Sequence, residues 1–572
     1  MSSKLLGEIL LEKGILTREN LEKAVNEQKR TGEYIGSLLI RMGYIAEKEL
    51  LGVLSEQFGI PYQSIKDTSI EDKIISSVPA KYAWHYKFMP LKIKGNVLTI
   101  AISNPMDMWL VEDIKLHLGF DVEIVLASEH EIRESLRKYY GVGAETVEKI
   151  LERETLKSKD ARDLEVKNLD LAEDIERSAE DASVIKLVNQ ILTEAIQARA
   201  TDIHIEPYRD SVKLRYRIDG ILYDTPIPAD MKYLHQAMVS RIKIISGLDV
   251  VERRLPQDGR AKVKVSNKET DLRISVLPSI YGENIVIRIL PTQLLLRLTD
   301  LGFAPSDQEK LEVLIKKPNG IIFLTGPTGS GKTTTLYACL SQINSAAIKI
   351  VTIEDPVEYE LMGVTQIQIN SKVGLTFANA LRSILRHDPD VMMVGEVRDF
   401  ETAELAIRTS LTGHLVFSTL HTNDACSGIA RLLDMGIEPF LVASSVEVFI
   451  AQRLVRLFCP ECKQEIPLSS ANIPAGQTLE LYKAHNINTI YRGKGCEACK
   501  FTGYRGRSAI YEMLLIDDSI RELILAKASA ADIKKRALSL GMKTLKDHGL
   551  EEVAGGKTSL EEVLRVTSLE GF

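Results

Sequence analysis

The segment GPTGSGKT at residues 326–333 constrains this chain more than any other feature of its sequence. It follows the apolar run IIFLT, typical of a buried strand, and precedes a helical pattern. In a G-x-x-x-x-G-K-T pattern the glycines let backbone N–H groups close around phosphate oxygens, the lysine reaches the β and γ phosphates, and the last hydroxyl binds Mg²⁺. The predicted ATP and magnesium contacts are Gly326, Pro327, Thr328, Gly329, Ser330, Gly331, Lys332, Thr333 and Thr334.

Acidic residues end two further strand-like runs downstream of this loop. VTIEDPVE places Glu354 and Glu358 at the end of one strand, and VMMVGE places Glu396 at the end of another. Strands that alternate with helices predict a parallel sheet with ligand sites at the strand ends. Glu396 is then expected to help place Mg²⁺, because Gly395 stands where an aspartate is common, and Glu354 or Glu358 is expected to orient the attacking water. Helix capping is the alternative role for such acids.

Two histidines bracket the apolar run in GHLVFSTLHTN. His414 and His421 are seven residues apart, which predicts opposite faces of an extended segment, so they are not expected to contact one ligand together. Either one is a candidate for sensing the γ-phosphate, and a structural hydrogen bond is the equally weighted alternative.

Four cysteines form two C-x-x-C pairs, Cys459 with Cys462 and Cys496 with Cys499, with 33 residues between the inner cysteines. Two such knuckles suit a tetrahedral Zn²⁺ site without an open position, so the metal is predicted to be structural. A redox dithiol pair is the competing interpretation. Cys339 and Cys426 stand alone and are expected to pack in cores.

The first 60 residues contain an internal repeat. Gly7, Gly14, Leu21 and Gln28 recur as Gly36, Gly43, Leu50 and Gln57, each 29 positions later. The pattern predicts two stacked helical hairpins, which could form an interaction domain. Residues 61–140 alternate short strand-like and helical stretches, residues 141–181 form a charged linker, and 182–295 and 296–572 are two further α/β domains.

Composition excludes several classes of protein. The 572 residues suffice for about four domains. The 72 basic and 79 acidic residues give a net charge of −7, so a nucleic-acid partner is not expected. No segment approaches about 18 uninterrupted apolar residues, so membrane association is expected only through partners or a surface.

Together these motifs resemble the secretion ATPase superfamily, which powers type IV pilus assembly and type II secretion. The diagnostic segments are ATDIHIEP at 200–207, RLPQDGR at 254–260, DLRISVLPSIYGENIVIRIL at 271–290, the phosphate loop, TIEDPVE, the GE element and GHLVFSTLHTN. The resemblance implies an α/β multidomain protein. It has a RecA-like ATPase core, a preceding PAS-like domain, an N-terminal helical plus α/β regulatory region and a tetracysteine zinc element.

The resemblance also implies site residues and partners. Arg273 and Arg288 match the arginines that help to bind phosphate, and six copies are expected to form a ring. The repeat is similar to the tandem motif of a cyclic-di-GMP-binding domain, in which Lys4 replaces an expected arginine. A plain docking module is the alternative for that region.

The tetracysteine element and the N-terminal extension resemble the assembly (extension) ATPases more than the retraction ATPases. We therefore expect a cytoplasmic hexamer at the inner face of the bacterial inner membrane, using ATP, Mg²⁺ and Zn²⁺. Its expected partners are an inner-membrane platform protein and cytoplasmic pilus assembly proteins. A type II secretion motor is the first alternative, and a cyclic-di-GMP-controlled binding module with slow hydrolysis is the second.

Overall fold

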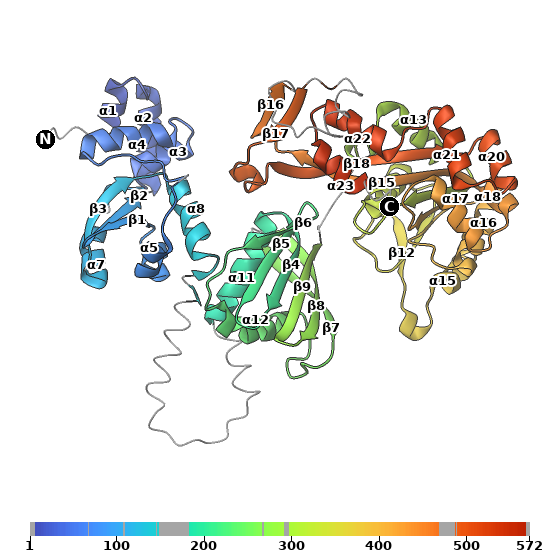
Figure 1. Ribbon diagram of the computed structural model, residues 1–572, viewed down its shortest axis with the longest axis horizontal. Helices are drawn as coiled ribbons and strands as arrows, with labels where there is room; N and C mark the ends of the chain where they lie inside the picture. The colour runs from blue at the N-terminus through green and yellow to red at the C-terminus, as the bar shows by residue number, and fades with distance from the viewer. Residues whose placement is uncertain are drawn as a thin grey trace, which may run out of the picture. The chain divides into compact units, whose positions relative to one another are not determined.

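The computed structural model describes residues 6–147, 182–290 and 297–567, apart from breaks at 32, 67, 107–108, 145, 266–267, 468–486 and 488 (Figure 1). The chain divides into two compact units, Met1–Ile289 and Leu290–Phe572, and each is described by itself. Most of the predicted linker, residues 148–181, and Lys4 lie outside the described residues. Among the described residues, no helix combines the length and apolarity needed to cross a bilayer.

The repeat forms the two predicted helical hairpins at the start of the first unit. Their helices are α1 (Leu6–Glu12), α2 (Arg18–Thr31), α3 (Ile35–Arg41) and α4 (Glu47–Phe58). A Cβ on Gly7 would lie 2.8 Å from Leu21 Cδ1, and a Cβ on Gly36 would lie 3.0 Å from Leu50 Cδ2. Helix packing therefore explains the 29-residue repeat, because in each hairpin the equivalent glycine makes room for the equivalent leucine.

A small mixed domain follows the hairpins. Its three strands are β1 (Met89–Lys94), β2 (Val97–Ile102) and β3 (Asp121–Leu126), with β1 antiparallel and β3 parallel to the central β2. Its helices are α5 (Asp72–Ser77), α6 (Ala80–His85), α7 (Trp109–Leu118) and α8 (Glu129–Tyr140). Buried residues from α5, α7 and α8 join those of the strands in one core.

The second half of the first unit is a six-stranded sheet in the order β6-β5-β4-β9-β8-β7. The strands are β4 (Ala200–Pro207), β5 (Val212–Ile218), β6 (Ile221–Thr225), β7 (Gln257–Val265), β8 (Lys268–Ser279) and β9 (Gly282–Leu290), and the helices are α11 (Ala182–Gln197) and α12 (Met231–Ile245). Val142 and Val147 pack into this core, so the first residues of the segment predicted as linker belong to the sheet domain.

The second unit is built on a seven-stranded sheet in the order β12-β11-β13-β14-β10-β15-β18. Its strands are β10 (Gly320–Thr325), β11 (Ile350–Glu354), β12 (Val364–Gln368), β13 (Val391–Val394), β14 (Leu415–Leu420), β15 (Val446–Phe458) and β18 (Tyr504–Leu515). All neighbours are parallel except the pair β15 and β18. The predicted parallel sheet is confirmed.

Helices cover both faces of this sheet. Alternate residues of β10 point to opposite sides: Ile322 and Leu324 join the core of α13 (Pro305–Leu314) and α14 (Lys332–Ile343). Ile321 and Phe323 join the other core. That second core is formed with α15 (Phe377–Ile384), α16 (Phe400–Leu411), α17 (Cys426–Asp434), α18 (Pro439–Ser445), α20 (Asp518–Leu525), α21 (Ala530–Ser539), α22 (Leu545–Ala554) and α23 (Leu560–Thr567).

The C-terminal elements complete this unit. The helix α21 contacts α17, and α20 contacts α18, so the orange and red helices lie beside one another in Figure 1. A separate two-stranded sheet, β16 (Lys463–Pro467) with β17 (Thr489–Gly493), lies in sequence between β15 and β18.

Candidate functional site: a phosphate loop and a tetracysteine centre

The phosphate loop joins the end of β10 to the start of α14. Gly326, Gly329 and Gly331 have φ values of +140°, +82° and +91°, which residues with a side chain rarely adopt. The sequence therefore folds into a tight turn directly before the N-terminus of α14, where the free N–H groups and the helix dipole favour an anion. The buried Ser330 hydroxyl has no hydrogen-bond partner in the described part of the chain, which fits a phosphate oxygen as its partner.

Lys332 lies within this turn rather than out in solvent. Its Nζ donates to the carbonyl oxygens of Gly326 at 2.6 Å and Pro327 at 3.1 Å. Burial and, to a smaller extent, the nearby Arg453 guanidinium lower the pKa of Lys332 to about 8, although Glu396 acts in the opposite direction. A bound phosphate would therefore give the ammonium a charged hydrogen-bond acceptor in place of these neutral carbonyl oxygens, which makes a stronger interaction.

This lowered pKa predicts a pH dependence of nucleotide affinity. Phosphate binding favours the charged lysine, so the interaction is fully present below the free-protein pKa and is lost as the pH rises through it. We expect KM for ATP to increase above about pH 8, approaching tenfold per pH unit. Steady-state kinetics from pH 7 to 9.5 measure this. In the Lys332→Arg variant, any remaining ATP binding should not weaken over this pH range, because arginine stays charged. A wild-type KM that does not change with pH would contradict the role of Lys332 in phosphate binding.

Two polar residues of β15 support the loop and were not singled out from the sequence. Gln452 donates from Nε2 to the Ser330 carbonyl at 3.0 Å and accepts from Thr335 Oγ1 at 2.9 Å, so it bridges the loop and α14. Arg453 donates to the Asn423 carbonyl at 2.8 Å. A polar Gln-Arg pair inside the apolar run VFIAQRLV was the available signal.

Removing the Gln452 bridge tests this support. Gln452→Leu keeps the approximate volume but leaves the Thr335 hydroxyl and the Ser330 carbonyl without this partner, at a cost of about 1–3 kcal/mol. We expect kcat/KM for ATP to fall roughly tenfold or more, since the loop loses its anchor to β15. The control is Gln308→Leu on α13, whose side chain bonds Glu312 of the same helix. Equal kinetics of both variants would exclude a supporting role.

Glu396 follows β13 near the loop. Its carboxylate lies 2.5 Å from Arg398 Nη2 and 3.4 Å from His421 Nε2. A Cβ on Gly395 would lie 3.1 Å from the Ile353 carbonyl oxygen, closer than a side chain normally packs. This close approach to β11 explains why a glycine occupies the place where an aspartate is common.

Glu354 is buried and fully engaged. It accepts from Thr352 Oγ1 at 2.6 Å, from Gln366 Nε2 at 3.1 Å, and from the hydroxyl of Tyr337 on α14. Burial and this carboxylate raise the pKa of Tyr337. Glu358 lies in the loop beyond β11, where its backbone N–H contacts the Tyr337 hydroxyl at 3.4 Å. The network ties the end of β11 to the helix that follows the phosphate loop.

The two histidines lie at opposite ends of β14. His421 follows the strand beside Glu396, whereas His414 precedes it and its Nδ1 contacts the Thr409 carbonyl at 3.1 Å. Because β14 is parallel to β10, His414 is at the edge of the sheet away from the phosphate loop. The structure brings together Lys332, Glu396 and His421, and it does not bring His414 to them.

Arg273 and Arg288 belong to the first unit, on the neighbouring strands β8 and β9. Arg288 Nε donates to Asp202 at 3.0 Å on β4, so the guanidinium is held across the sheet. Asp202 also lies 3.6 Å from Arg217.

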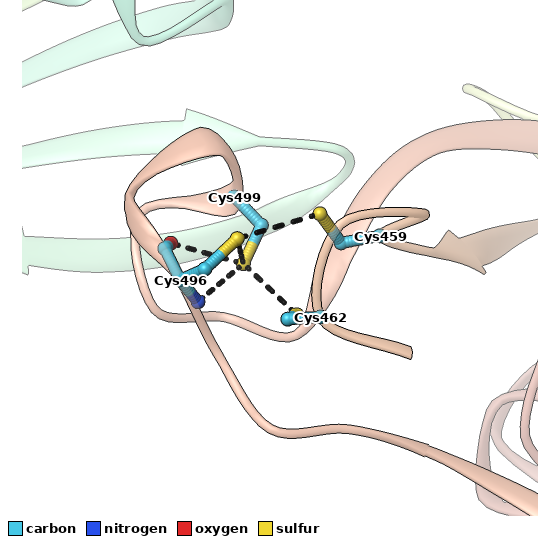
Figure 2. Close-up of side chains that lie close together, drawn as sticks. All are labelled: Cys459, Cys462, Cys496 and Cys499. Carbon is cyan, nitrogen blue, oxygen red and sulfur yellow. Dashed lines mark hydrogen bonds between the residues drawn. The ribbon is translucent and has the colours of Figure 1, made fainter. Parts of the chain in front are cut away.

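The four predicted cysteines converge on one point (Figure 2). Their Sγ atoms all lie within 4.8 Å of one another, with separations of 3.7 Å for Cys459 and Cys496 and 3.8 Å for Cys462 and Cys499. A tetrahedral Zn²⁺ with bonds of about 2.3 Å requires sulfur separations of about 3.8 Å, so the residues fit this metal. They are free thiols rather than disulfides.

Backbone N–H groups prepare these sulfurs for a metal. Gly495 donates to Cys462 Sγ at 3.3 Å, and Cys499 Sγ accepts from Cys496 at 3.1 Å and Gly503 at 3.3 Å. Burial opposes ionisation of Cys499, but these donors and the neighbouring thiols lower its pKa to about 7. Burial raises the pKa of Cys462 and Cys496, so of these three thiols Cys499 ionises at the lowest pH. Zn²⁺ binds the thiolate form.

The fold and these sites define a P-loop nucleotide-binding protein with a RecA-like core. The profile of the Type II/IV secretion system protein family matches residues 177–565, and that of the MshEN domain matches residues 58–146. The chain therefore belongs to the type II/IV secretion system protein family, whose members are ATPases.

Two relatives match almost the whole chain. The chain is 43% identical to the type IV pilus assembly ATPase PilB of Myxococcus xanthus over 580 aligned positions, covering 99% of both chains. It is 37% identical to the type II secretion system protein E of Xanthomonas campestris pv. campestris, covering 98% of both. The X-ray structure of the Yersinia pseudotuberculosis ATPase DotB matches with a TM-score of 0.50 and 20% identity, covering 67% of this chain and 94% of that one, which shows the fold alone.

Proposed function

We propose that the chain hydrolyses ATP to drive type IV pilus assembly. The observation that carries this proposal is the 43% identity to a type IV pilus assembly ATPase across 99% of both chains. A phosphate loop with Lys332 and Ser330 turned inward supplies the chemistry that such an activity needs. Pilin polymerisation would be the work to which hydrolysis is coupled, through an inner-membrane platform protein.

In this proposal each side chain near the loop has a role that its position permits. Lys332 neutralises the β and γ phosphates, while Thr333 and Glu396 hold Mg²⁺, which would stabilise charge on the transferring phosphoryl group. His421, 3.4 Å from Glu396, senses the γ-phosphate. Glu358 positions the attacking water, and the Glu354 carboxylate, which also accepts from Thr352, Gln366 and Tyr337, is the alternative.

In the same proposal, the first unit couples ATP hydrolysis to movement of the ring. Six chains form a ring, and Arg273 and Arg288 stabilise phosphate charge from the sheet domain that precedes the core. The ring acts in the cytoplasm, at the inner face of the inner membrane, where it is held by the platform protein and by cytoplasmic assembly proteins. No nucleic-acid partner is proposed, because the net charge is −7.

The test is ATP turnover of the full-length protein with and without the platform protein, read together with oligomer size by light scattering. We expect a hexamer whose hydrolysis rises when the platform protein is added. A monomer without turnover under both conditions would overturn the proposal.

A type II secretion motor is the second candidate, favoured by the 37% identity to a type II secretion system protein E over 98% of both chains. Hydrolysis would be the same and the product would be a pseudopilus. A deletion strain distinguishes the two: loss of surface pili with normal protein secretion supports the first candidate, and the opposite phenotype supports the second.

We also propose that the N-terminal region binds cyclic-di-GMP. The MshEN match at residues 58–146 and the adjacent tandem repeat support this regulatory role. Titration calorimetry of the full-length protein with cyclic-di-GMP tests it, with GMP as the control ligand. Saturable binding that changes ATP turnover is expected, and no heat above that of GMP would instead favour a docking module.

A further inference from the structure

The segment after His421, residues 421–424, is anchored to the nucleotide-binding strands on one side. Thr325 Oγ1, at the end of β10, donates to the Asp424 carbonyl at 3.4 Å. Arg453 on β15 donates to the Asn423 carbonyl at 2.8 Å. The backbone that carries His421 toward Glu396 is therefore held by the same two strands that hold the phosphate loop.

The other side of this segment is anchored to the C-terminal part of the chain. Asp424 Oδ2 lies 3.3 Å from Nζ of Lys534 on α21, and its Oδ1 accepts from the Ser427 N–H at 2.7 Å in the first turn of α17. Glu512 on β18 accepts from the Ala425 N–H at 3.1 Å and lies 4.0 Å from the same Lys534 ammonium. One lysine thus neutralises two carboxylates, which accept from the N–H groups of residues 425 and 427 in one turn.

The burial of this cluster makes the lysine hard to replace. The Glu512 side chain is fully buried, and those of Asp424 and Lys534 are 18% and 27% exposed. In such a site two carboxylates that lose this counter-ion repel one another more strongly, and water solvates them only poorly. Any movement that separates them strains the hydrogen bonds through which both hold the turn at 424–427.

We propose that Lys534 is a positioning residue for ATP hydrolysis: it holds the 421–424 segment in the register that places His421 beside Glu396. The inference rests on the proposed hydrolysis at the phosphate loop. It gives the C-terminal helices, for which the sequence offers no motif, a mechanical connection to the nucleotide site. A shift of α21 would change the His421–Glu396 geometry without touching nucleotide.

The test uses the full-length chain and two measurements. Lys534→Met removes the charge but keeps much of the apolar stem, and Lys535→Met is the matched control because its side chain is exposed on the same helix. We expect Lys534→Met to lower kcat at least about tenfold with KM for ATP within about twofold, and Lys535→Met to change neither. Hydrogen exchange of the peptide containing the Ala425 and Ser427 amides should accelerate about fivefold or more only in Lys534→Met.

Charge compensation separates positioning from general destabilisation. Asp424→Asn in the Lys534→Met background removes one of the two facing charges and keeps an oxygen for the Ser427 N–H, so at least half of the lost kcat and exchange protection should return. Equal behaviour of the two lysine variants, or a loss that the asparagine does not reverse, would overturn the inference. The exchange measurement does not depend on ATP hydrolysis. An inactive wild type would therefore contradict the proposed function, while the exchange rates would still decide whether Lys534 holds the turn at 424–427.

Discussion

Lys332→Ala is expected to reduce ATP turnover at least about a hundredfold. The ammonium is the charge that the loop turns inward, and a group aimed at developing phosphate charge in a desolvated site contributes about 10²–10³ in rate. Phosphate release under saturating ATP and Mg²⁺ measures the effect. Because the lysine also binds ground-state phosphates, the affinity for a fluorescent ATP analogue should fall as well.

Protein integrity must be controlled in this experiment. Lys310→Ala removes a surface lysine of α13, whose exposed ion pair with Asp307 is worth little, so its turnover should match the wild type. Thermal unfolding of Lys332→Ala should remain a single transition near that of the wild type, since a buried charge held by neutral carbonyl groups contributes little net stability. Turnover within tenfold of the wild type would show that Lys332 does not serve the nucleotide.

Local patterns predicted the parts of the site that lie on continuous segments. The loop at 326–333, the strand before it and the helix after it form one motif, whose conformation is specified by glycines at left-handed positions. The cysteines were equally predictable, because two C-x-x-C turns of this spacing satisfy one tetrahedral metal. In both cases the ligand chemistry restricts the local sequence strongly.

Contacts between distant strands were not predictable in this way. Gln452 reaches Ser330 and Thr335 only because β15 pairs with β10, and a sheet order is not encoded in the pattern of either strand. The Glu354 network similarly depends on where α14 crosses β11. Lys534 carries no motif, since its significance arises from two carboxylates that are 110 and 22 residues away in the chain.

The two histidines were correctly expected not to share a ligand, but the reason lies in the ends of the strand rather than in its two faces. A spacing of seven residues indicated that His414 and His421 could not share a ligand, on the ground that they face opposite sides of a strand. The structure separates them along the strand axis, because β14 covers only Leu415–Leu420 between them. The end of the strand at which each lies therefore decides which histidine meets Glu396.

Loss of the tetracysteine site is the second prediction with a large effect. Cys496→Ser is expected to reduce zinc content from about one ion per chain to a small fraction and to lower the midpoint of thermal unfolding by roughly 10 °C. A structural zinc site contributes an apparent binding free energy of about 10–16 kcal/mol, comparable with the stability of a whole domain. Elemental analysis and calorimetry of the purified chain measure both quantities.

The control separates this effect from the loss of a buried thiol. Cys339→Ala removes a buried thiol on α14 that lies in a different core, so zinc content should be unchanged and the destabilisation modest. Retention of one zinc per chain in a Cys496→Ser, Cys499→Ser double variant would exclude the tetracysteine site as the metal centre. A zinc-free wild type with paired cysteines would favour the redox interpretation.

The zinc site should also influence hydrolysis, although none of its ligands approaches the phosphate loop in sequence. Cys459 follows the last residue of β15, and its N–H donates at 3.0 Å to the carbonyl oxygen of Gly503, which precedes β18. A metal held by the four cysteines would therefore join the chain just after β15 to the chain just before β18, and β15 carries Gln452. Zinc removal, followed by removal of the chelator and restoration of Mg²⁺, should lower kcat/KM in the same direction as Gln452→Leu. Because both changes would loosen one strand, adding Gln452→Leu to the zinc-free protein should cost less than it does in the zinc-bound protein, and full additivity would show that the two sites are independent.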